Sequence, residues 1–195
     1  GNTPADTMEW VATHVEALGG DKEQLTDIDE FDLTEYELEE DTFEVESYGH
    51  HQELARYRQN AEGILQLYAS KFEHASPVRT WPGDFDSASH IPLVKENGKA
   101  KKTIEIGLSI ADEHIDEIYF YVKHALAGEE PEYDDLPAIE VGDWHDDEWT
   151  GAILKSSSLL EQDEQEQAAL DFFKSAIGAS IELLGLDKEE FSLQT

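Results

Sequence analysis

The sequence predicts an all-α protein: a single-domain up-and-down bundle of about five helices with long irregular crossings. Two observations support this fold class. Apolar residues recur every three or four positions in several long stretches, and residues typical of helix ends flank those stretches. In this interpretation the segment 103–127 is the central helix, and residues 1–195 form one acidic helical domain.

The segment 103–127 reads TIEIGLSIADEHIDEIYFYVKHALA. Its apolar stripe advances by four or three residues at each step, which is typical of a helix with one face on a core. The stripe consists of Ile104, Leu108, Ala111, Ile115, Ile118, Val122 and Ala125. Gly128 follows at a position where helices commonly end. The pattern therefore predicts a long core-facing helix.

Similar patterns predict helices on both sides of this segment. They cover residues 3–18, 50–75, 144–160 and 163–184. Pro4 suits the first turn of a helix, whereas Gly19 and Gly185 suit positions just past a helix end.

Three segments lack such a pattern and are predicted to be irregular. They are the acidic segment 21–48 and the long loops 76–100 and 129–143. Residues 42–46 alternate between polar and apolar and fit a short strand.

A short β-hairpin is an alternative in the second loop. Residues 91–95 and 102–106 flank Glu96-Asn97-Gly98, and Asn-Gly is a favoured pair in tight hairpin turns. We favour a helix that begins at about Lys101.

The charge of the chain is strongly negative. Its 46 acidic residues against 13 Lys and Arg give a formal charge of −33. Direct binding of nucleic acid or of an anionic membrane surface is disfavoured, because both need clustered Lys and Arg. Three explanations remain: a high-salt environment, a basic partner, or high solubility alone.

Composition also limits the cellular location and the kinds of site that the protein can have. The chain has no cysteine, which excludes disulfides and thiolate zinc sites. It has no apolar run of about 20 residues, so no transmembrane helix is expected. The first residue is Gly1 rather than Met, so we expect a soluble protein that is either cytoplasmic or exported after loss of an N-terminal signal.

The polar face of the predicted central helix carries a candidate metal site. It consists of Glu113, Asp116, Glu117 and His114. Carboxylates on one helical face suit Mg²⁺, a hard cation that prefers oxygen ligands. An EF-hand calcium site at Asp27 and Asp29 is disfavoured, because Asp32 stands where that loop needs a glycine.

The stretch Glu113-His-Ile-Asp116, followed by an apolar run, resembles the second half-motif of all-α nucleotide pyrophosphohydrolases of the MazG and dimeric dUTPase kind. The resemblance implies a magnesium-dependent hydrolase with Glu113 and Asp116 in its site. The other half-motif, ExxE on the preceding helix, is absent from 50–75. A metal-dependent hydrolase is therefore the enzymatic alternative rather than the main hypothesis.

The main hypothesis is a non-enzymatic acidic helical protein that binds a basic protein surface, as inhibitors, immunity proteins and nucleic-acid mimics do. The contact regions are predicted at 21–48 and 129–149. The candidate contact residues are Asp27, Asp29, Glu30, Phe31, Asp32, Tyr36, Trp144, Asp146 and Asp147. A third possibility is an exported or halophilic soluble protein whose acidity serves no partner.

Overall fold

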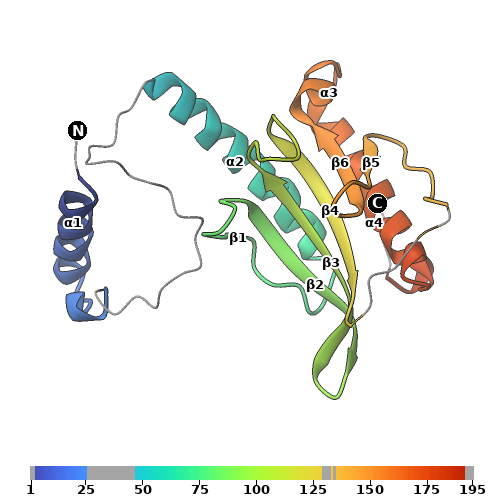
Figure 1. Cartoon of the computed structure of the whole chain (residues 1–195), viewed down its shortest axis with the longest axis horizontal. Helices are drawn as coiled ribbons and strands as arrows, with labels where there is room; N and C mark the ends of the chain where they lie inside the picture. Colours follow the sequence, from blue (N-terminus) through green and yellow to red (C-terminus); the bar gives the residue numbers. More distant parts are fainter. Residues whose placement is uncertain (1–2, 26–46, 129–132, 134, 192–195) are drawn as a thin grey trace. The chain divides into compact units, whose positions relative to one another are not determined.

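The structure is a computed structural model, and it describes residues 3–25, 47–128, 133 and 135–191 (Figure 1). The chain divides into two compact units, residues 1–54 and 55–195. The prediction of a single domain stays a prediction. The strand predicted at 42–46 lies outside the described residues.

The N-terminal unit begins with helix α1 (Pro4–Ala17), which the 3-10 helix η1 (Lys22–Leu25) follows. Thr3 caps α1: its Oγ1 accepts the backbone N–H of Asp6 at 3.1 Å, and the Asp6 carboxylate accepts the N–H of Thr3 at 2.9 Å. This reciprocal capping box pairs N–H groups that a helix start leaves unpaired. The helix predicted at 3–18 is confirmed.

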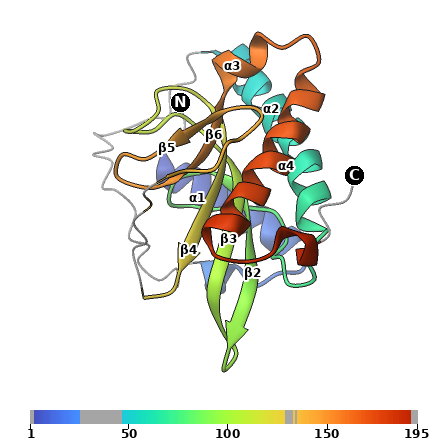
Figure 2. The ribbon, with the colours of Figure 1, turned by 90° about the vertical axis from the view of Figure 1, so that its right-hand side faces the viewer.

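The second unit is built on a six-stranded antiparallel sheet, so the prediction of an all-α helical bundle is wrong (Figures 1 and 2). The strand order is β1-β2-β3-β4-β6-β5. The strands are β1 (Arg79–Thr80), β2 (Ser87–Glu96), β3 (Lys99–Ser109), β4 (Tyr119–Leu126), β5 (Asp143–His145) and β6 (Gly151–Lys155).

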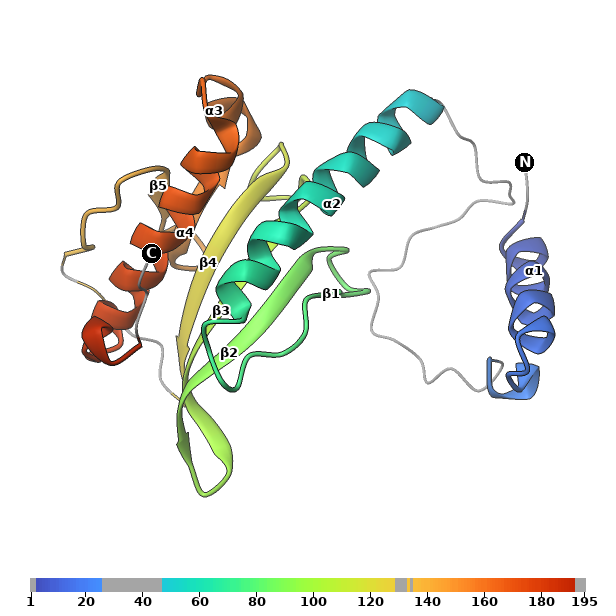
Figure 3. The ribbon, with the colours of Figure 1, turned by 180° about the vertical axis from the view of Figure 1, so that it is seen from behind.

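Helices pack on one face of this sheet (Figure 3). They are α2 (Tyr48–Ala69), α4 (Gln165–Leu183) and the short α3 (Ser156–Leu160), which leads from β6 toward α4; the 3-10 helix η2 (Lys188–Phe191) follows α4. The core lies between the helices and the sheet. Leu65, Phe173 and Ile177 of the helices pack there with Ile104 and Val122 of the sheet, and all five side chains are fully buried. The helices predicted at 50–75 and 163–184 are confirmed as α2 and α4. They end earlier than predicted, at Ala69 and Leu183.

The predicted central helix at 103–127 is wrong. The segment forms most of β3, a connection at 110–118 and β4. Ile104 and Leu108 are four residues apart, a spacing that puts two side chains on the same face of a helix and also of a strand. Ile106 distinguishes the two, because it is 0% exposed beside Ile104 and only a strand places both on one face.

The hairpin that the sequence offers as an alternative is present and longer than expected. β2 and β3 pair from Glu96↔Lys99 to Ser87↔Leu108. Asn97 and Gly98 form the turn with φ of 51° and 78°. Positive φ at both central residues is required in a type I′ turn, which Asn-Gly favours.

The helix predicted at 144–160 is also wrong for most of its length. Residues 143–145 and 151–155 are the paired strands β5 and β6, and only the last residues are helical, in α3. Ala152 and Leu154, 0% and 1% exposed, face the core from β6, which explains the apolar residues there.

Candidate functional site

Residues of α2 and α4 line an open groove. Figure 3 shows that both helices lie on the same face of the sheet. The volume of the groove is about 640 Å³. Ligand sites typically have volumes of roughly 300–1,000 Å³. Phe120, near the start of β4, and Leu159 of α3 also line the groove.

Small residues leave this space open. Ala61 and Gly63 of α2 and Ala169 of α4 all line the groove, and a Cβ added at Gly63 would meet no atom within 4 Å. A glycine inside a helix destabilises it by roughly 0.5–1 kcal/mol relative to alanine. The remaining lining is largely apolar, and Leu67 there is 49% exposed. The chain thus presents apolar surface to solvent in a concave site.

The α3–α4 segment, which contributes four residues to the groove lining besides Leu159 of α3, is rich in carboxylates. Residues 156–173, which form α3 and the first half of α4, contain no Lys, Arg or His. Their acids are Glu161, Asp163, Glu164, Glu166 and Asp171. Glu166 itself lines the groove, together with the polar side chains of Gln165 and Asn60. This side of the groove is therefore negatively charged and suits a cationic ligand.

A second polar cluster lies on the opposite face of the sheet. The Tyr121 ring covers Gly107, and its hydroxyl donates to the carboxylate of Asp86 and to Glu105 Oε1, the latter at 3.2 Å. Burial raises the pKa of Asp86 above its usual range, although the hydrogen bond from Tyr121 opposes this shift. Burial and the two neighbouring carboxylates raise the pKa of Tyr121. The hydroxyl therefore stays protonated and holds two acids together.

Aromatic packing completes this second cluster. Lys123 Nζ lies 4.2 Å from the Trp149 ring centroid and 5.1 Å from that of Tyr121. Cation–π contacts of this kind stabilise a lysine on an aromatic surface. Tyr121 is 2% exposed, so the cluster has little room for a ligand and is structural.

The residues predicted to hold magnesium do not share a helical face. Glu113, His114, Asp116 and Glu117 lie on the 110–118 connection between β3 and β4. Both Glu117 oxygens are engaged at the start of α3: Oε2 accepts from Ser156 Oγ at 2.8 Å and from the N–H of Ser157 at 2.7 Å, and Oε1 accepts from Ser157 Oγ at 2.9 Å. These hydrogen bonds lower the pKa of Glu117, and the bond from the Ser157 N–H has the largest effect.

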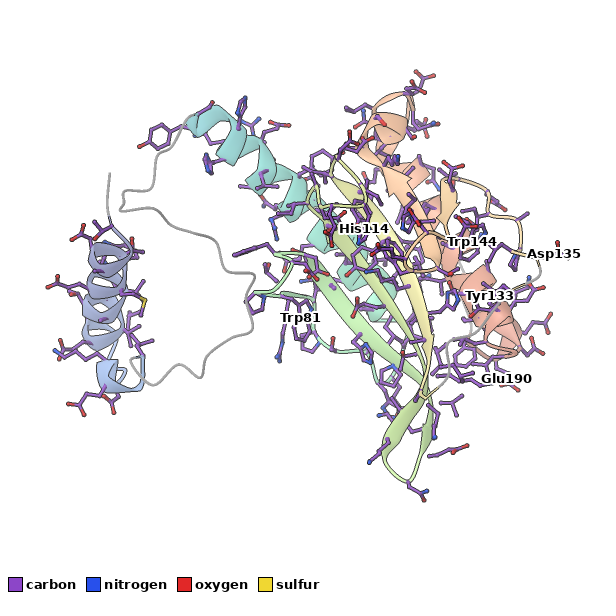
Figure 4. All side chains as sticks on the ribbon, viewed as in Figure 1. Trp81, His114, Tyr133, Asp135, Trp144 and Glu190 are labelled. Atoms are coloured by element: carbon purple, nitrogen blue, oxygen red, sulfur yellow. The ribbon has the colours of Figure 1, made fainter. Side chains whose placement is uncertain are left out.

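His114 instead meets residues of the β5–β6 region (Figure 4). Its Nε2 lies 3.7 Å from both Glu113 Oε1 and Glu148 Oε2, and its ring centroid is 6.2 Å from that of His145. Among the residues that the structure describes, no three His, Asp or Glu side chains are grouped so that they could hold a metal ion. The magnesium hypothesis therefore gains no support from this arrangement.

The predicted partner-binding residues fall into two groups. Asp27, Asp29, Glu30, Phe31, Asp32 and Tyr36 lie outside the described residues. Trp144 is half-buried on the helix side of β5, where its Nε1 donates to the carbonyl of Pro137 at 2.7 Å. Asp146 and Asp147 are exposed after β5. Of the predicted contact residues that the structure describes, Trp144 is held by this hydrogen bond and packs against the core, while Asp146 and Asp147 face solvent.

Sequence reasoning missed the groove. Ala61 and Ala169 are far apart in the chain, and each reads as an ordinary core position of its own helix. The available signal was Gly63, since a glycine in the middle of a strong helical pattern often has a packing or functional reason.

Comparison of the chain with known protein families, with curated proteins and with solved structures finds no match. In the part of the chain that the structure describes, no helix has both the length and the apolar character needed to cross a membrane.

Proposed function

We propose that this protein is a non-enzymatic binding protein whose groove between α2 and α4 takes an apolar, positively charged segment of a protein partner. The proposal is carried by one observation: the open groove has a largely apolar lining that includes the carboxylate of Glu166, in a segment, 156–173, with five acids and no Lys, Arg or His. Such a site favours a ligand that is apolar where it touches the floor and cationic at its edge.

Each half of this complementarity has a physical effect. Apolar surface contributes roughly 25 cal/mol per Å² when it is removed from water, so the lining around Leu67 and Ile64 supplies affinity. Charge acts mainly on encounter: a net charge of −33 attracts a cationic partner over a distance set by the ionic strength. The proposal thus predicts fast association that weakens with salt.

Lysine and arginine side chains suit such a site by themselves. Their aliphatic stems cover apolar surface while their charged ends reach water or a carboxylate. A stem that lies along Leu67, which lines the groove and is 49% exposed, can place its charged end near Glu166. A basic segment with few large apolar residues can therefore still fill the groove.

Two synthetic peptides test this function. One is an amphipathic helix of leucine and lysine, and the other has glutamate in place of every lysine. We expect saturable binding of the lysine peptide to the full chain, measured by fluorescence anisotropy, and at least tenfold weaker binding of the glutamate peptide.

Substitutions at Gly63 locate the binding to the groove. Gly63→Phe places a ring in the open space and should abolish binding, whereas Gly63→Ala leaves most of the space and should not. Both variants are first checked for folding by circular dichroism. Equal affinity of wild type and Gly63→Phe for the lysine peptide would show that the acidic surface binds it elsewhere and would refute the proposal.

A further inference from the structure

Helix α2 is apolar over more of its circumference than its contact with the sheet requires. Leu65, Tyr68 and Ala69 are buried in the core of the second unit. Ile64 and Leu67 line the groove, and Leu67 is 49% exposed although it is a large apolar side chain. Because residues three apart lie on the same side of a helix, α2 presents a second apolar stripe to the groove.

The walls of the groove offer few hydrogen-bond partners to the backbone of a ligand. The α2 wall, residues 57–67, lies inside a helix, which pairs its own N–H and C=O groups. Phe120 belongs to β4, which pairs with β3 on one side and with β6 on the other. The first turn of α4 is the exception, since its N-cap residue Glu164 makes no side-chain capping bond.

An extended peptide is therefore a poor ligand for this groove. The α2 wall is about 15 Å long at 1.5 Å per residue. A strand of that length brings about five residues, and thus about ten backbone N–H and C=O groups. Each of these groups that is buried without a partner weakens binding by roughly 5- to 150-fold. The polar side chains of the lining are too few to pair them: Tyr57, Asn60, Gln165 and Glu166.

A helix avoids this loss, because it pairs its own backbone and presents only side chains. The same 15 Å of wall matches about ten residues, or nearly three turns, of a second helix. Ala61, Gly63 and Ala169 line the groove, and their small side chains let such a helix approach closely. The Tyr68 hydroxyl donates to the carbonyl of Leu170 at 2.6 Å and ties α2 to α4. The space thus exists before a ligand binds, which avoids the cost of ordering a site.

We propose that the groove binds an amphipathic α-helix of a protein partner, about three turns long, whose apolar stripe packs against α2 and α4 and whose groove-facing side carries one Lys or Arg opposite Glu166. The inference rests on the proposed function and names the conformation and the charge pattern of the bound segment. Among the residues that line the groove, Glu166 is the single carboxylate. Charge complementarity therefore calls for one cation at this place rather than for a lysine-rich face.

Two peptides of identical length and composition test the conformation. Each has an apolar stripe at helical spacing, one lysine and one proline. The proline stands at the first helical position of one peptide, where a helix tolerates it, and in the centre of the other, where it breaks a helix. Fluorescence anisotropy gives the affinity of each peptide for the full chain, and difference circular dichroism reports the helix formed on binding.

We expect the peptide with the terminal proline to bind at least about tenfold more tightly than the other. It should also gain helix content when it binds, because a helix this short is marginal in water by itself.

A double-mutant cycle tests the charge pattern. Glu166→Gln should weaken binding of the terminal-proline peptide by about two- to fivefold. The same variant should leave unchanged the affinity of a peptide with glutamine in place of lysine. Glu96→Gln, at the end of β2, removes the same charge from a residue that does not line the groove and should change neither affinity.

Equal binding of the two proline peptides, or a bound peptide that gains no helix, would overturn the inference. If Gly63→Phe still blocks that binding, the proposed function stands and only the helical partner is excluded. Equal effects of Glu166→Gln and Glu96→Gln would show that the cation is wrongly placed. If neither peptide binds to the full chain, the proposed function itself fails.

Discussion

Replacing Gly107 by alanine should strongly destabilise the fold. Gly107 pairs with Tyr121 across β3 and β4, and a Cβ at this position would lie 2.4 Å from Tyr121 Cζ and 2.5 Å from its hydroxyl oxygen. The ring is 2% exposed and packs with Ile153 and Ala88, so it has nowhere to move without disturbing its neighbours.

Two effects add to the loss. Overpacking a close-packed site costs typically about 1–3 kcal/mol. Displacing the ring also withdraws its hydroxyl from Asp86, a carboxyl that is 8% exposed, and a buried acceptor left without a donor costs about 1–3 kcal/mol more. We therefore expect a loss of about 2–6 kcal/mol, measured from urea midpoints.

A double-mutant cycle separates this contact from a general effect of alanine in a strand. In a Tyr121→Ala background the ring is gone, so Gly107→Ala should then have little effect. The companion Tyr121→Phe keeps the ring and should lose only the hydroxyl, about 1–3 kcal/mol. A Gly107→Ala protein as stable as wild type, or an equal penalty in both backgrounds, would refute the reasoning.

Three further predictions concern stability. Burial lowers the pKa of His124 from 6.5 to about 4, so the fold favours the neutral ring and its stability should fall, by up to about 3 kcal/mol, as pH drops from 6.5 toward 4. Urea midpoints at pH 7 and 4.5 should show this fall relative to His124→Leu, and parallel pH profiles would contradict it. Lys102→Met keeps the stem but leaves the Leu184 carbonyl without its donor, which should cost about 1 kcal/mol in the same assay; an unchanged midpoint would argue against the cap. Because screening weakens self-repulsion, the melting temperature of this −33 chain should climb between 0.1 M and 2 M KCl, and a flat profile would speak against repulsion as a limit on stability.

Helices with local start and stop signals could be predicted from the sequence. Thr3 and Pro4 place the start of α1, and Gly185, with φ of 66°, follows the end of α4. These signals work because a helix pairs its backbone within itself, so a cap acts on groups only a few residues away.

The β3–β4 region could not be assigned in the same way. A spacing of four residues, as from Ile118 to Val122, fits one face of a helix and one face of a strand equally. The distinguishing features were the alternation of Ile104, Ile106 and Leu108 and the aromatic and β-branched run at 119–122, both typical of strands. The helical interpretation passed over Ile106.

The candidate sites, too, could be predicted only where they depend on residues close together in the sequence. The acids at 113–117 look like one helical face in the sequence, but Glu117 binds the start of α3 and His114 approaches Glu148. The groove draws Gly63 and Ala169 from helices that are separated by the whole sheet in sequence. Neither arrangement is visible until the strands pair.

By itself, the sequence determined the acidity of the chain and the ends of α1 and α4, and it offered the Asn97–Gly98 turn as an alternative, because each depends on composition or on contacts between near neighbours. Only the tertiary structure decided that residues 103–127 form two strands and that α2 and α4 enclose a groove. A strand is stabilised by partners distant in the chain, and here those partners, β2, β4 and β6, outweighed a pattern that a helix would also satisfy.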